Sequence, residues 1–307
     1  MGKDARPATL REVAEAVGCS VATVSRVLAG DRPVGPDLAR RVQEAARELG
    51  YLPNQVARAL RSRSTATVGL VLPQITNPFF PSLMREVERA LHEQGRALLL
   101  ADSADDPVLE AERIELLIAR QVDGLIVAPV DQERSMATLA KAAARVPVVL
   151  LDRSVDPIQA DAVTVDNAAG IRLLLEHLHK LGHSRFWFLG AAGDASAAVE
   201  RRAAFHDWAV RHAAYWRVEL GAFSIDFGQH AAGRAVTGFD DVDLASLTTP
   251  DLTTVRQPNR ELAAEAARML AARMQQPEAA ARAVRLTPTL VTRGSTVVVG
   301  SSRESKL

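Results

Sequence analysis

Four side chains near the start of the chain have the types and spacing needed to contact the edges of nucleic-acid bases. Val21, Ala22, Ser25 and Arg26 lie within six residues, at the N-terminal end of a predicted helix and off its apolar face. Small and hydroxylated side chains allow a close approach to a groove, and arginine can bind guanine or phosphate. This combination indicates a surface that contacts DNA in its major groove.

Two short helices joined by a glycine turn are predicted to position these side chains. Thr9 and Glu12 form a capping box that begins the first helix, Gly18 ends it, and Ser20 can cap the second. Their facing apolar residues are Leu10, Val13, Ala14 and Val17 in the first helix and Val24, Val27 and Leu28 in the second. This pattern is typical of a helix-turn-helix, and the alternative is an ordinary helical hairpin in a bundle core.

Length and charge support a chain of two or three domains with a basic head. The chain has 307 residues and no net charge, but residues 1–63 hold 11 Lys and Arg against 7 Asp and Glu. A basic head suits a polyanionic partner. Cys19 is the only cysteine, so no disulfide within the chain is possible. We find no membrane span and no signal peptide, and we expect a soluble protein of the cytoplasm.

The head continues through a third helix, which opens at Pro36 and Asp37 and stops at Gly50. Asn54 can then cap a short helix that runs to Arg61, and a polar linker follows. We therefore place the head domain at residues 1–64.

From residue 67 onward, apolar strands alternate with longer helical segments. We expect strands over 68–72, 96–101, 124–128, 146–151, 185–189, 218–223, 235–239 and 296–300. We expect helices over 80–94, 108–120, 135–144, 168–181, 197–212 and 260–274. This alternation predicts an α/β core of doubly wound parallel sheets in two lobes, with a ligand cleft at the carboxyl ends of the strands.

Several short motifs are spread along nearly the whole chain, at 9–14, 21–28, 50–54, 77–80, 123–126, 181–183, 237–241 and 252–258. In these segments the chain resembles the LacI/GalR family of bacterial transcription repressors. The resemblance implies a homodimer that binds a palindromic double-stranded DNA operator and responds to a small-molecule effector, often a sugar or nucleoside. It also implies a core like the type I periplasmic binding proteins over residues 65–307. We expect its first lobe at about 65–163 plus 252–285 and its second at about 164–251 plus 286–300.

The same resemblance assigns roles to individual residues. It makes residues 54–61 a hinge helix and Leu60 a wedge into the minor groove. The expected DNA contacts are Thr9, Ser20, Val21, Ala22, Thr23, Ser25, Arg26, Asn54, Ala57 and Leu60. The expected effector contacts are Phe79, Phe80, Asp152, Arg201, Phe223 and Asp240. Carboxylates and a guanidinium suit hydroxyl or acidic groups, and aromatic rings suit a ligand face. Alternatively, Phe80 is a core residue, Arg201 lies on a solvated helix face and Asp152 caps a turn.

The chain departs from the family pattern in two places. Gly35 stands where the family usually has a helix-capping side chain, which costs a few tenths of a kcal/mol. More seriously, Arg234 runs directly into the segment that ends in Phe239 and Asp240, whereas the family has a further strand and helix there, with an effector-contacting Asn-Asp pair. One such unit is roughly 30 residues. We expect a second lobe with a reduced sheet.

Other functions have less support in the sequence. A solute receptor of the same core fold would need neither the basic head nor its helix pair. A regulator that has lost its effector response remains an alternative because of the shortened lobe. An enzyme has no supporting motif: we find no Gly-x-Ser-x-Gly elbow, no His and Cys spacing for a metal and no phosphate-binding glycine loop. We expect no catalytic residue, metal or cofactor.

Overall fold

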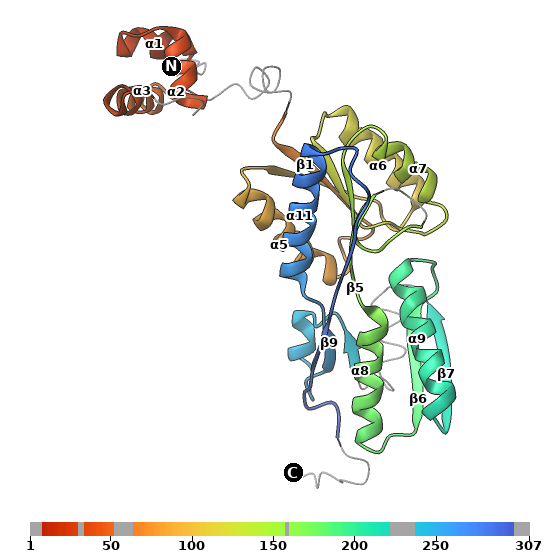
Figure 1. The fold of residues 1–307 in the computed structure, drawn as a ribbon. Helices are drawn as coiled ribbons and strands as arrows, with labels where there is room; N and C mark the ends of the chain where they lie inside the picture. The colour runs from red at the N-terminus through yellow and green to blue at the C-terminus, as the bar shows by residue number, and fades with distance from the viewer. Residues whose placement is uncertain (1–7, 30–33, 52–63, 157–159, 222–236, 298–307) are drawn as a thin grey trace, which may run out of the picture. The chain divides into compact units, whose positions relative to one another are not determined.

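The computed structural model describes residues 8–29, 34–51, 64–156, 160–221 and 237–297. The chain forms two compact units, Met1–Thr65 and Ala66–Leu307, and each is described by itself (Figure 1). Within the described ranges, no helix is both long enough and apolar enough to cross a membrane.

The described residues of the first unit form three helices, α1 (Leu10–Val17), α2 (Val21–Ala29) and α3 (Pro36–Glu48). They pack around a small core in which Val13, Val24 and Val42 are fully buried. The helices are short, so this shared core stabilises them more than their own propensity does. The guanidinium of Arg41 on α3 donates to the carbonyl of Val17 at 2.8 Å, which satisfies an acceptor at the end of α1.

The predicted ends of α1 and the predicted starts of α2 and α3 are confirmed. Thr9 and Glu12 form both halves of the capping box, and Gly18 has the left-handed φ of 72° that ends α1. Ser20 Oγ accepts from the Thr23 amide at 3.1 Å at the start of α2. Gly35 precedes α3 without a side-chain cap, as expected for glycine.

One part of the second unit is a parallel sheet of six strands in the order β10-β5-β4-β3-β1-β2. Its strands are β1 (Thr67–Leu72), β2 (Ala97–Asp102), β3 (Gly124–Val127), β4 (Val148–Asp152), β5 (Asp161–Val165) and β10 (Ala283–Leu286). Strands β1, β3 and β4 are almost wholly apolar and buried, as the central strands of a sheet covered on both faces must be.

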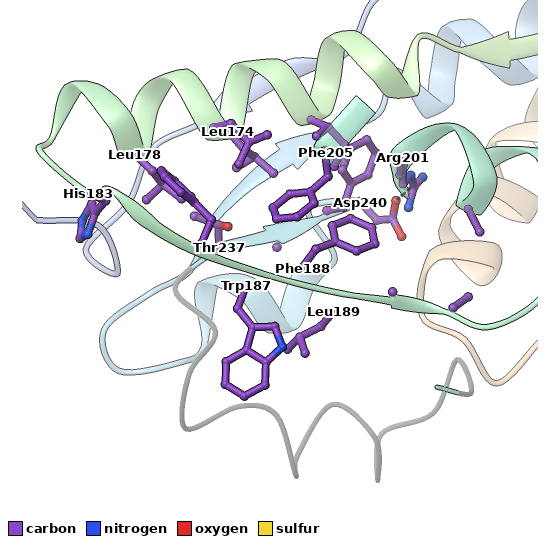
Figure 2. Close-up of a pocket in the computed structure, with 18 of the residues that line it drawn as sticks. Leu174, Leu178, His183, Trp187, Phe188, Leu189, Arg201, Phe205, Thr237 and Asp240 are labelled. Carbon is purple, nitrogen blue, oxygen red and sulfur yellow. Dashed lines mark hydrogen bonds and ion pairs between the residues drawn. The ribbon is translucent and has the colours of Figure 1, made fainter. Parts of the chain in front are cut away.

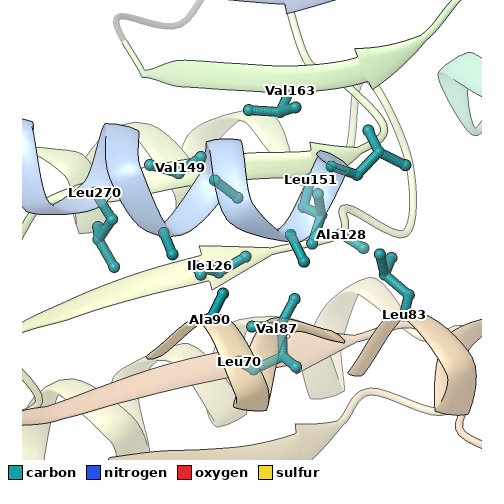
Figure 3. Close-up of a cluster of buried hydrophobic side chains, with 14 of the residues drawn as sticks. Leu70, Leu83, Val87, Ala90, Ile126, Ala128, Val149, Leu151, Val163 and Leu270 are labelled. Carbon is teal, nitrogen blue, oxygen red and sulfur yellow. The ribbon is translucent and has the colours of Figure 1, made fainter. Parts of the chain in front are cut away.

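Helices cover both faces of this sheet. On one face α5 (Phe79–Glu93) and α11 (Asn259–Gln275) pack on Leu70, Ile126 and Val149 (Figure 3). On the other face α6 (Pro107–Ala119) and α7 (Met136–Ala143) pack on Val71, Leu125 and Leu150. Alternate residues of one strand point to opposite faces, so adjacent side chains of β1 enter different cores. These elements form the first lobe.

The second lobe contains two sheets that no ladder joins among the described residues. Strands β6 (Arg185–Ala191) and β7 (Tyr215–Gly221) pair with each other in parallel. Strands β8 (Thr237–Phe239), β9 (Thr253–Arg256) and β11 (Thr289–Val291) form the other sheet, in which β8 is parallel and β11 antiparallel to β9. Helices α8 (Asn167–Lys180) and α9 (Ser196–His212) pack together beside these strands (Figure 1).

The strand order shows where the chain crosses between the lobes. Strand β9 lies in the second lobe, so the chain returns to the first lobe after Arg256 rather than near residue 252. Strand β10 belongs to the first lobe and β11 to the second, and neither was predicted. The expected strand over 296–300 is wrong for Thr296 and Val297, which lie outside any strand, and its other residues lie outside the described part. Strand β9 already pairs on both sides, with β8 and β11, so it has no open edge for a further strand.

Candidate functional site

The expected base-contacting residues lie on the outer side of α2. Val21, Ala22 and Arg26 are exposed, whereas Val24 on the same helix is fully buried against α1 and α3. Arg26 Nε donates to the Ala22 carbonyl at 3.2 Å within the helix. The helix therefore presents a small apolar surface with an exposed guanidinium, which is suitable for contact with base edges.

Three of the hydroxyl side chains expected to contact DNA are hydrogen-bonded to other side chains at the starts of helices. Thr9 Oγ1 donates to Glu12 at 2.9 Å, and Ser20 Oγ lies 2.8 Å from Thr23 Oγ1. Ser25 is half-buried. Contact of any of these residues with DNA stays a prediction. The expected hinge helix with Asn54, Ala57 and Leu60 lies outside the described residues.

A cleft in the second unit is lined from both lobes. The first lobe contributes side chains that follow β1 and end β4, and the second contributes side chains from the start of α9 and the end of β8. Five of the six expected effector residues line it together: Phe79, Phe80, Asp152, Arg201 and Asp240. Phe223 lies outside the described residues. The role of these residues in ligand binding stays a prediction.

Asp152 is a buried carboxyl group with a raised pKa. It ends β4 with a left-handed φ of 67° and is 4% exposed. Its Oδ2 lies 3.7 Å from Arg153 Nε, and its Oδ1 has no hydrogen-bond partner. Burial raises the pKa of Asp152 to about 6, against the opposing effects of Arg153, Arg201 and a side-chain contact with Gln257. A buried carboxylate oxygen with no partner is ready to accept a hydrogen bond from a ligand.

Arg201 and Asp240 form an ion pair in the same cleft as Asp152, and neighbouring side chains fix its position. Arg201 Nε donates to Asn167 Oδ1 at 2.7 Å, its guanidinium lies 3.4 Å from Asp240 Oδ1, and it stacks over the Phe239 ring at 3.7 Å. Asp240 also accepts from Gln257 Nε2 at 2.7 Å. Arg201 is therefore not on a solvated helix face. Its orientation is set before any ligand arrives, which lowers the entropy cost of binding.

Sequence reasoning missed several polar residues around the cleft. Arg153 is 5% exposed, stacks 5.5 Å from the Phe80 ring and donates to the Pro129 carbonyl at 3.0 Å. Asn167 and Gln257 are also buried. The signal for Arg153 was its place directly after Asp152 at a strand end. Phe80 is both a core residue, at 2% exposed, and part of the cleft wall.

Together these features define a class of protein: a helix-turn-helix head followed by a two-lobed α/β core with a cleft between the lobes. Residues 65–219 match the family described as "Periplasmic binding proteins and sugar binding domain of LacI family", residues 9–54 match "Bacterial regulatory proteins, lacI family", and residues 234–296 match "Periplasmic binding protein-like domain". The chain belongs to the LacI family and is a DNA-binding transcription regulator.

Individual relatives match along nearly the whole chain. The HTH-type transcriptional regulator PtxS of Pseudomonas plecoglossicida is 31% identical over 328 residues, covering 94% of this chain and 96% of PtxS. The ribose operon repressor of Escherichia coli is 29% identical, covering 94% and 99%. A crystal structure of the lac repressor dimer bound to operator and the anti-inducer ONPF has a TM-score of 0.82 at 24% identity, covering 95% and 100%, and shows the same fold. The PtxS alignment is longer than this chain of 307 residues, so PtxS has residues that this chain lacks.

Proposed function

We propose that this chain is a homodimeric repressor of a carbohydrate transport or catabolic operon, and that a small polyhydroxylated molecule in the interlobe cleft controls it. The observation that carries this proposal is the convergence of Asp152, Arg201 and Asp240 from two lobes on one cleft. A ligand that bonds both lobes is bound more tightly by one lobe arrangement than by others, so it can shift the balance between arrangements.

The donor and acceptor set of the cleft favours a ligand rich in hydroxyl groups. Asp152 Oδ1 supplies an acceptor without a partner, and Arg201 supplies a guanidinium that is already oriented. Phe79 and Phe80, with ring centroids 5.1 Å apart, provide apolar contact. Hydroxyl groups both donate and accept, so they suit such a mixed set. The similarity to the ribose operon repressor supports the same ligand class.

A homodimer is supported by the first lobe and by the symmetry that a palindromic operator requires. Strand β2 is an edge strand of the six-stranded sheet, and its Leu99 and Leu100 are 37% and 42% exposed. Exposed apolar side chains on a sheet edge are a typical association surface. Two heads related by a two-fold axis would then bind two half-sites. We also propose that the protein acts in the cytoplasm and does not turn its ligand over.

A second candidate is a regulator of the same kind that does not respond to a sugar. The cleft volume is only about 20 Å³, which is close to the space for one water molecule. The second lobe has a divided sheet. If the cleft does not open further, the chain binds its operator without control by a sugar.

Thermal unfolding with a panel of pentoses, hexoses and nucleosides separates these candidates. We expect at least one compound to raise the melting temperature of the wild type and to be recovered unchanged. Asp152→Asn, which cannot carry the charge, should lose this shift. Glu115→Gln, which changes an exposed carboxylate of α6, should keep it. If no compound shifts the wild type, the regulator without sugar control is correct.

Selection of binding sites from random duplexes tests the DNA contact. We expect the wild type to select a palindrome and Arg26→Ala to lose about 1–3 kcal/mol of affinity and relax its preference at one base pair per half-site. Arg40→Ala, an exposed arginine of α3, should leave the preference unchanged. If Arg26→Ala lowers affinity equally for all sequences, Arg26 contacts phosphate instead.

A further inference from the structure

A cavity of about 350 Å³ that is partly open lies in the second lobe, between β6 and β8. All seven residues of β6 and all three of β8 line it, and α8 and α9 close one side. Figure 2 shows Leu174, Leu178, Phe188 and Phe205 around this space, and Trp187 on the opposite side of β6 from Phe188. The cavity occupies the place where the two sheets of this lobe fail to meet.

The walls of the cavity are mostly apolar but include polar side chains at both ends, His183 at the far end and Arg201 and Asp240 where it approaches the interlobe cleft (Figure 2). Arg185 and Thr237 also line it. Its walls include Leu174, Leu175, Leu178, Phe205 and Phe239. Leu174, Leu175 and Phe205 are themselves buried, at 3–7% exposed. This lining favours an alkyl or aryl group over a hydrated one.

The cavity and the cleft have residues in common. Ala198, Arg201 and Asp240 line both spaces. Arg201 lies over the Phe239 ring, which belongs to the cavity wall, while its guanidinium also bonds Asp240. One ligand can therefore contact Arg201 and Asp240 with a polar group and continue past them into the apolar space.

The volumes of the two spaces decide where most of a ligand must lie. The cleft offers about 20 Å³ and the cavity about 350 Å³. Ligand pockets usually fall in the range of about 300–1,000 Å³. Only the cavity reaches this range, and it is large enough for a chain of several carbon atoms or a substituted ring.

We propose that the cavity between β6 and β8 binds the apolar part of an amphipathic effector, an alkyl or aryl group attached to a hydroxylated head that lies at Arg201 and Asp240, where the cavity meets the cleft. The inference about the head rests on the proposed function, and the inference about the apolar part does not. An extended apolar peptide could also enter between two strand edges. The lining residues that the cavity shares with the polar cleft, Ala198, Arg201 and Asp240, favour the small molecule.

Two homologous series test the proposal on the full-length protein. The first is the 1-alkanols from butanol to octanol, which have no sugar, and the second is the corresponding alkyl β-D-glucosides. Dissociation constants are measured by ligand-observed NMR titration. We expect affinity to rise about fourfold for each buried methylene in both series until the cavity is full. We also expect each glucoside to bind at least tenfold more tightly than its alcohol.

Three variants locate the binding. Leu174→Trp fills the cavity and should abolish the dependence on chain length. Leu178→Ala widens it and should shift the optimum to a longer chain, which provides a test if Leu174→Trp does not fold. Leu116→Trp places the same ring on the exposed face of α6 and should behave as the wild type.

The outcomes separate the two parts of the proposal. If the affinity of the wild type for the alcohols does not change with chain length, the proposed apolar site is wrong and the cleft proposal is unaffected. A rising series that the cavity variants do not change overturns the location. If the alcohols bind in the cavity and the glucosides bind no more tightly, the two spaces do not share one ligand. This result would also count against the proposed polyol head.

Discussion

At the scale of single residues, two aspartates of the cleft have backbone conformations that aspartate adopts only with some strain. Asp152 and Asp240 have φ angles of 67° and 84°, and each lies at the carboxyl end of a strand, in β4 and directly after β8. Conformations of this kind are sparsely populated and cluster at functional sites. They point both carboxyl groups at one cleft, which supports the proposed ligand contact.

The raised pKa of Asp152 predicts a pH-dependent stability. Its folded-state pKa is about 6, above its ordinary value of 3.8. The folded state therefore holds the proton more tightly than the unfolded chain, so this contribution is fully present below about pH 4 and is lost as the pH rises through 6. Asp152→Asn removes the charge. We expect it to be as stable as the wild type near pH 4 and about 2–3 kcal/mol more stable at pH 7.5.

Urea unfolding of both proteins at pH 4, 6 and 7.5 measures this difference. The free energy of unfolding of the variant minus that of the wild type should increase with pH. A constant difference would show that the carboxyl group of Asp152 titrates alike in the folded and unfolded states.

At the scale of elements, a glycine sets how closely α8 approaches the sheet of β8 and β9. A Cβ added to Gly170 would lie 2.7 Å from Phe239 Cζ and 3.2 Å from Val255 Cγ1. Alanine improves helix propensity by about 1 kcal/mol, but an overlap with a ring held under Arg201 costs about 1–3 kcal/mol. We expect Gly170→Ala to lower the free energy of unfolding by about 1 kcal/mol.

Gly193→Ala is the matched control, because a Cβ there meets no atom within 4 Å. Its free energy of unfolding should stay within about 0.5 kcal/mol of the wild type. Chemical denaturation followed by circular dichroism gives both values. A Gly170→Ala variant that is more stable than the wild type would show that Phe239 moves freely.

At the scale of the whole molecule, the two lobes of the core are unequally built. The first lobe has six strands covered on both faces, with Leu70, Ile126 and Leu150 almost wholly buried. The part of the second lobe that the structure describes has sheets of two and three strands, and small sheets are only marginally stable unless they pack well. Its strands β6 and β8 border a cavity instead of a shared partner strand.

This asymmetry predicts that the second lobe unfolds before the first. Calorimetry of the full-length protein should show a lower transition from the second lobe, and limited proteolysis should cut first between His212 and Asp251. Hexyl β-D-glucoside should raise the lower transition if it fills the cavity. A single cooperative transition with no preferential cleavage would show that the divided sheets behave as one well-packed lobe.

The sequence by itself determined the family and most of the elements. The apolar periodicities, the capping box at Thr9 and the turn at Gly18 depend on residues close together in the chain, so local physics sets them. The helices and most strands accordingly lie within a few residues of their predicted bounds. The quoted motifs were enough to identify the LacI family, which the comparisons confirm.

Only the tertiary structure decided how distant segments meet. Strands β9, β10 and β11 are three or four residues long and gain their stability from neighbours far along the chain, so no local pattern marks them. The partners of Arg201, at Asn167 and Asp240, come from α8 and the end of β8. Against the family pattern, the sequence predicted that a strand and a helix are missing before β8. Whether β6 and β8 would then pair or stay apart depends on how α8 and α9 pack on them, and in the structure they stay apart around a cavity.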